Sequence, residues 1–132
     1  SVIHQSRYGE HGPGPAGTLM VGSFTLNGQE VMVLNGGPIY KLSPAFSFVI
    51  QTDSQEETDY YWDALAADGE IMACGWLTDR FGVSWQVVPN LLGKLMADPD
   101  KQKAGRVMQA MLKMKKIDSA LLQQAYDNPT PE

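Results

Sequence analysis

The sequence predicts an α+β fold, in which antiparallel strands and one helix precede a helical C-terminal region. Asn27-Gly28 separates two apolar runs, and both residues tolerate the positive φ angles of a tight hairpin turn. Ser54 with Glu57 three positions later has the pattern of a capping box, which indicates a helix start. After Pro89 apolar residues recur at helical spacing. With 132 residues the chain is long enough for one small domain with a hydrophobic core.

The N-terminal third predicts three strands, at residues 2–8, 19–26 and 30–34. Glycine and proline fill residues 9–17, so this stretch is expected to be a loop. The string Gly12–Gly17 fits the G-x-G-x-x-G pattern of dinucleotide loops. Its prolines lack N–H groups and a strand follows instead of a helix, so a stiff surface connection is the better interpretation.

The middle of the chain predicts a strand at 46–51, a helix ending at Gly69, and strands at 71–77 and 83–88. Asp79–Gly82 has the chemistry of a tight turn with its glycine in the left-handed region. The helical residues expected to face the core are Thr58, Tyr61, Trp62 and Leu65.

Three helices are predicted after Pro89. Asn90 is expected to cap the first, at 91–97; Asp98-Pro99 to start the second; and Asp118 to cap the third. The apolar face of the second helix carries Val107, Met108, Met111 and Leu112, with Met114 at its edge, which is typical of core or subunit contact.

Composition excludes several classes of function. The chain has 10 Lys and Arg against 15 Asp and Glu, a net charge of −5, which argues against nucleic-acid binding. No apolar stretch approaches the roughly 20 residues of a membrane span, and no signal peptide is recognisable. Cys74 is the single cysteine, so no intrachain disulfide is possible and a reducing, cytoplasmic location is expected.

A few strand residues could line a concave sheet. Mostly apolar walls with a few polar groups are typical of a small-molecule pocket. The same residues would also suit an ordinary sheet core. They are Phe24, Asn35, Phe48, Cys74, Trp76 and Gln86.

Several strings, taken together, resemble the PhnB-like group, also called the 3-demethylubiquinone-9 3-methyltransferase domain. This group lies within the glyoxalase/bleomycin-resistance/extradiol-dioxygenase superfamily, or vicinal oxygen chelate superfamily. The resemblance runs from Ser1 to about Tyr126. The strings are Leu26–Glu30, Leu34–Pro38, Phe46–Val49, Cys74–Leu77, Asp79–Pro89 and Arg106–Met114.

The resemblance implies glyoxalase-like paired βαβββ modules around a shared cavity, commonly in a homodimer. The first strand and helix of module one have no counterpart in these residues, so they are expected to lie outside this sequence or to be replaced, for example by a partner chain. The expected organisation is one domain at 1–126, with an incomplete module one at 1–38, module two at 45–89, C-terminal helices at 90–126, and a frayed tail at 127–132.

Metal-dependent members of the superfamily use His and Glu ligands. The resemblance places those positions on Phe46 or Ser47, on Gln86, and on Leu34 or Asn35, none of which is a strong ligand. We therefore expect no metal and no cofactor, and a cavity in which Asn35, Ser47 and Gln86 orient an aromatic or quinone-like molecule. The family name implies methyl transfer, but no cofactor motif supports it. Two alternatives stay open: a non-catalytic, ligand-sequestering dimer of the bleomycin-resistance type, and a metal-dependent lyase or dioxygenase whose ligands are shifted by one residue.

Overall fold

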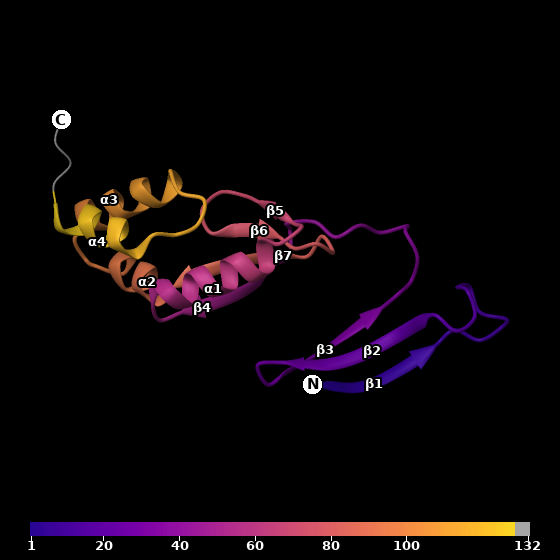
Figure 1. The fold of residues 1–132 in the computed structure, drawn as a ribbon. Helices are drawn as coiled ribbons and strands as arrows, with labels where there is room; N and C mark the ends of the chain where they lie inside the picture. The colour runs from indigo at the N-terminus through magenta and orange to yellow at the C-terminus, as the bar shows by residue number, and fades with distance from the viewer. Residues whose placement is uncertain (129–132) are drawn as a thin grey trace. The chain divides into compact units, whose positions relative to one another are not determined.

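The computed structural model describes residues 1–128 and divides the chain into two compact units, Ser1–Lys41 (unit 1) and Leu42–Glu132 (unit 2). Unit 1 is a three-stranded sheet, and the described part of unit 2 combines a four-stranded sheet with four helices (Figure 1).

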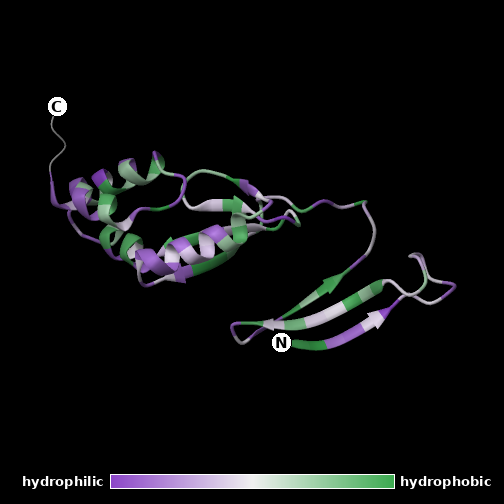
Figure 2. Cartoon of the chain, viewed as in Figure 1, coloured by the Kyte–Doolittle hydropathy of each residue, from purple (hydrophilic) through white to green (hydrophobic). Residues whose placement is uncertain are grey.

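Unit 1 consists of β1 (Val2–Arg7), β2 (Leu19–Leu26) and β3 (Gln29–Leu34), paired antiparallel in the order β1-β2-β3. The predicted turn at Asn27 and Gly28 is confirmed, with φ angles of 47° and 80°. Hydrophobic colour runs along β3, whereas much of β1 is hydrophilic (Figure 2). All three strands that the sequence predicts for unit 1 are present, with ends shifted by at most one residue.

Unit 2 begins with β4 (Phe48–Thr52), α1 (Gln55–Ala66), β5 (Glu70–Ile71), β6 (Trp76–Thr78) and β7 (Ser84–Pro89). The sheet order is β4-β7-β6-β5, with β4 parallel to β7 and the other pairs antiparallel. This is a βαβββ module, which confirms the glyoxalase-like α+β fold class.

The single strand predicted at 71–77 is wrong, because the chain reverses between Ile71 and Trp76 to form the β5–β6 hairpin. Cys74 and Gly75 take φ angles of 59° and 83°. Their amides donate to the carbonyls of Met114 and Lys115, both at 2.8 Å. A contact from 40 residues further along the chain thus holds the turn, so local strand propensity could not reveal it.

The C-terminal part of unit 2 forms α2 (Asn90–Met96), α3 (Lys101–Leu112) and α4 (Ser119–Asp127). Asn90 is the first residue of α2 instead of its cap, and its side chain donates to Asp53. The start predicted at Asp98-Pro99 is also wrong, since Asp100 caps α3 by accepting from two backbone amides. Asp118 caps α4 as predicted. Of the tail expected to fray, residues 129–132 lie outside the described residues.

Two buried clusters form the core of unit 2. Trp62, Leu77 and Val87 pack between α1 and the sheet, and the second cluster, between the C-terminal helices, contains Leu95, Val107, Ile117 and Leu122. The expectation of a buried Tyr61 is wrong, because it is 37% exposed beside Tyr60 at the outer side of the helix. Met108 and Leu112 are likewise exposed, whereas Met111 and Met114 pack against the second cluster. No helix within residues 1–128 is long and apolar enough to cross a membrane.

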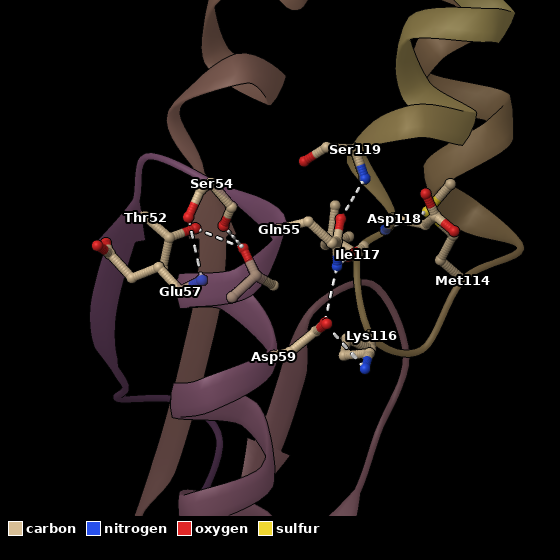
Figure 3. A network of polar contacts seen from close by, with 11 residues as sticks. Thr52, Ser54, Gln55, Glu57, Asp59, Met114, Lys116, Ile117, Asp118 and Ser119 are labelled. Carbon is tan, nitrogen blue, oxygen red and sulfur yellow. Dashed lines mark hydrogen bonds and ion pairs between the residues drawn. The ribbon is translucent and has the colours of Figure 1, made fainter.

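A polar network joins α1 to the segment before α4 (Figure 3). Gln55 Nε2 donates to Asp59 Oδ1 at 2.9 Å and to the Ile117 carbonyl at 3.0 Å, while Gln55 Oε1 accepts from the Ser119 amide at 2.8 Å. These bonds, together with an ion pair of 2.9 Å between Lys116 and Asp59, hold the C-terminal helices against the sheet module.

At the start of the same helix, Ser54 Oγ accepts from the Glu57 amide at 3.1 Å, as the capping box predicts. The Glu57 carboxylate accepts from Asp53 N at 3.3 Å and not from the Ser54 amide, so the reciprocal half of the box is displaced by one residue.

Candidate functional site

One face of the unit 2 sheet lies against α1, and the candidate polar residues lie on the other. Val87 belongs to the cluster under α1 and Trp85 packs against that cluster, so the alternation of a strand directs Gln86 to the opposite side. The register aligns Gln86 with Val49 on β4 and with Trp76 on β6. We call this row of Val49, Gln86 and Trp76 the open face. Val49 is 54% exposed, and Gln86 and Trp76 are half-buried.

The polar centre of the open face is a pair of neutral side chains. Gln86 Nε2 donates a hydrogen bond to Ser47 Oγ, at 3.0 Å, just before β4 begins. Because Ser47 Oγ accepts this bond, its own hydrogen is free to be donated, and Gln86 Oε1 is available as an acceptor. The structure thus brings together three of the expected site residues, Ser47, Trp76 and Gln86.

Phe48 lies on the opposite face. Its ring is 5.0 Å from the ring of Trp85, its partner across β4 and β7, and 5.4 Å from the exposed ring of Phe46. Trp85 in turn donates from Nε1 to Asp79 Oδ2 at 2.9 Å. Since side chains alternate along a strand, Phe48 cannot share a face with Val49 and Gln86.

Cys74 is not a strand residue of the open face. It is a free, half-buried thiol in the turn between β5 and β6, with the left-handed backbone described above. This position follows from the hydrogen bonds of the turn to the C-terminal segment.

Phe24 and Asn35 both belong to unit 1, but the structure does not bring them together. Phe24 is half-buried in the part of β2 that pairs with Val31 near the hairpin turn. Asn35 follows β3 at the other end, where its amide donates to the Met20 carbonyl at 2.8 Å and its Nδ2 to the Leu19 carbonyl at 3.0 Å. The Asn35 side chain therefore fixes the end of the hairpin.

The residues at the implied ligand positions do not fit a divalent transition metal. Gln86 turns its amide nitrogen, which offers no lone pair, toward Ser47, and both groups are neutral. No group of three or more His, Cys, Asp or Glu suited to hold a metal ion occurs among the described residues.

Ser84 was not among the expected residues. It is 2% exposed, pairs with Thr78, and lies two positions before Gln86 on the same face of β7. Within residues 1–128 it has the one buried side-chain oxygen or nitrogen that lacks a hydrogen-bond partner. The two-residue alternation of a strand would have placed Ser84 on the same face as Gln86. It would not have shown that the Ser84 hydroxyl lacks a hydrogen-bond partner.

The profile of the family described as 3-demethylubiquinone-9 3-methyltransferase matches residues 1–88 of the 132. The chain belongs to this family. The matched part of this PhnB-like chain includes unit 1 and most of the unit 2 sheet, and ends within β7. The helices α2, α3 and α4 lie beyond it.

Solved structures agree with the PhnB-like assignment. A PhnB protein from Bacillus cereus, named for the same methyltransferase, has 37% sequence identity and a TM-score of 0.61, over 67% of this chain and 78% of that chain. A protein from Pseudomonas aeruginosa, with 24% identity and a TM-score of 0.54 over 67% of this chain and 77% of that chain, supports the fold alone. No curated protein matches the chain.

Proposed function

We propose that this PhnB-like protein binds a small, planar, quinone-like molecule on the open face of unit 2, without a metal. The observation that carries the proposal is the hydrogen bond of 3.0 Å between Gln86 and Ser47, with the Trp76 side chain in the same row. A quinone has an apolar ring and carbonyl oxygens, which match an aromatic surface and neutral donors. The family name, which refers to a demethylated ubiquinone, supports the same class.

The chemistry of the pair favours binding over catalysis. A carboxamide and a serine hydroxyl do not exchange protons near neutral pH, so neither supplies a general acid or base. Methyl transfer would require a site for S-adenosylmethionine. The glycine string at 12–17 leads into β2 and not into a helix N-terminus, so it does not fit that cofactor in the way dinucleotide loops do.

Isothermal titration with duroquinone tests the proposal. All four ring carbons of this quinone other than the carbonyl carbons carry a methyl group, so the Cys74 thiol has no unsubstituted position to attack. We expect saturable binding by the wild-type chain. Gln86→Ala should weaken it about tenfold, in line with the loss of roughly one hydrogen bond. Trp76→Ala should weaken it similarly. Gln123→Ala on α4, whose side chain bonds to Asp127, is the matched control. Absence of saturable binding, or equal affinity in all variants, would overturn the proposal.

Binding without reaction is checked separately. We expect mass spectrometry to find 2-hydroxy-1,4-naphthoquinone unchanged after incubation with the protein and S-adenosylmethionine. A methylated product would show that the protein catalyses methyl transfer, and would contradict a function limited to binding.

A sequestering homodimer is the second candidate, favoured by apolar side chains on unit 1. Val2 is 66% exposed, Met32 68% and Leu34 67%, and exposed strands of this kind invite pairing. Light scattering after size-exclusion chromatography should give twice the mass of the chain. A monomer across the accessible concentration range would rule this form out.

A further inference from the structure

Two glycine- and proline-rich segments of unit 1 meet around one tyrosine. Residues 13–15 belong to the loop between β1 and β2, and residues 35–38 follow β3. Together with Tyr8 they line a pocket of about 240 Å³. All of these lining residues belong to unit 1.

Tyr8 holds the pocket together. The side chain is 8% exposed, and its hydroxyl donates to the Asn35 carbonyl. The main chain of Tyr8 pairs with the far end of the loop, its amide donating to Thr18 and its carbonyl accepting from Gly17, both at 2.9 Å. A Cβ on Gly14 would come within 2.5 Å of the Tyr8 ring, so only glycine allows the loop to lie this close.

Three proline rings form part of the wall, and the free donors are backbone amides. The rings of Pro13, Pro15 and Pro38 contribute carbon surface and no N–H group. Within residues 1–128 the amides of Gly36 and Gly37 donate no hydrogen bond, and Gly37 has a φ of 94°. The lining contains no ionised side chain.

We propose that this pocket is a second small-molecule site, which takes an aromatic carboxylate with a single ring. Its volume is below the range of pockets for drug-sized ligands and suits one ring. The ring would pack against the prolines and Tyr8. A monoanionic carboxylate would accept from the unpaired Gly36 and Gly37 amides, whereas a phosphate dianion would lack the Lys or Arg charge that it needs.

Amide-resolved NMR with sodium benzoate tests the inference on the full chain. We expect saturable shifts at Tyr8, Gly36 and Gly37, with a dissociation constant of about 1–10 mM, as is typical of a ligand of nine non-hydrogen atoms. Benzyl alcohol, which lacks the carboxylate, and acetate, which lacks the ring, should each bind at least several-fold more weakly. Equal binding of all three probes, or no saturable shift, would overturn the proposal.

Variants locate the site. Gly14→Ala should abolish the benzoate shifts, because its Cβ displaces the loop from Tyr8. Gly9→Ala is the matched control in the same loop, since its Cβ would meet no atom within 4 Å. Pro15→Ala removes part of a wall without that clash and should weaken binding several-fold, with unchanged unit 2 resonances reporting an intact fold. Wild-type binding by both Gly14→Ala and Pro15→Ala would place benzoate elsewhere and refute the site.

Discussion

Ser84 combines deep burial with a hydroxyl that lacks a partner. A buried donor without a hydrogen bond costs about 1–3 kcal/mol, so this residue lowers the stability of the chain. By contrast, the buried hydroxyls of Thr52 and Thr58 pair with each other at 2.6 Å. The two environments allow a direct comparison.

We predict that Ser84→Ala leaves the free energy of unfolding unchanged or raises it, because the change removes an unpaired hydroxyl. Thr52→Val should lower it by about 1 kcal/mol, since it deletes a satisfied hydrogen bond at nearly constant shape. Urea unfolding measures both. A loss for Ser84→Ala as large as that for Thr52→Val would show that Ser84 has a partner.

Single residues were predictable where their chemistry is local. The Asn27-Gly28 turn, the Ser54 cap and the Asp118 cap depend on neighbours within three positions, so the sequence contains their cause. The placement of Phe48 and Cys74 depends on distant segments. The side chain of Phe48 lies on the sheet face that carries Trp85, which is the face that α1 covers. The backbone of Cys74 is held by a hydrogen bond to the Met114 carbonyl.

At the scale of elements, α1 and the C-terminal helices are joined through one side chain. Gln55 makes two hydrogen bonds to the segment before α4 and one to Asp59. Asp59 is also paired with Lys116. The hydrogen bond from Gln55 is the larger cause, and the one from Lys116 the second, of a lowered pKa of the Asp59 carboxyl.

Gln55→Ala should therefore destabilise the chain by about 2 kcal/mol, because it leaves partly buried backbone groups unpaired. Gln123→Ala, whose side chain bonds only to exposed Asp127, should change stability by less than about 0.5 kcal/mol. Chemical denaturation of both variants checks the contrast, and equal effects would refute the role of Gln55.

A second contact at this scale responds to pH. The Tyr126 hydroxyl of α4 donates to the Asp98 carboxylate, which lowers the pKa of Asp98 below 3.8 and raises the pKa of Tyr126 above 10.0. The stability that Asp98 contributes to the folded chain is fully present above pH 3.8. It is lost as the pH falls through the folded pKa of Asp98. The stability that Tyr126 contributes is fully present below pH 10.0. It is lost as the pH rises through the folded pKa of Tyr126.

We predict that Tyr126→Phe reduces the loss of unfolding free energy at both extremes of pH. Both residues are only half-buried, so water screens the pair and the change is small. Tyr60→Phe, on the outer side of α1, is the control. Urea denaturation across the pH range measures the profile, and identical curves for wild type and Tyr126→Phe would contradict the prediction.

At the scale of the whole molecule, the two units differ in what they bury. Unit 2 contains both buried hydrophobic clusters, whereas the buried residues of unit 1 are Tyr8, Gly22 and Ser23. The sequence predicted the βαβββ pattern and the C-terminal helices, because amphipathic spacing and turn residues mark them. It did not predict how little of unit 1 is buried, since that depends on which surfaces meet and not on local pattern.

We expect residues 42–132 to unfold cooperatively in urea when produced alone, because both clusters remain. Residues 1–41 alone should show little stable strand structure, as three strands without a covered face are marginal in water. Circular dichroism distinguishes the two. A gradual, non-cooperative transition for residues 42–132 would show that unit 2 requires unit 1.

The parallel pairing of β4 with β7 has a consequence for synthesis. Residues 53–83 separate these two strands, and β7 is central in the sheet order β4-β7-β6-β5. On the ribosome, β4 leaves the exit tunnel well before the strand that completes its ladder, so it waits with open backbone groups while α1 and the β5–β6 hairpin form. A pause in translation shortly before β7 would prolong that exposure, whereas a pause after it would not. In the interval before Ser84 emerges, β4 is therefore open to pairing with another copy of the chain.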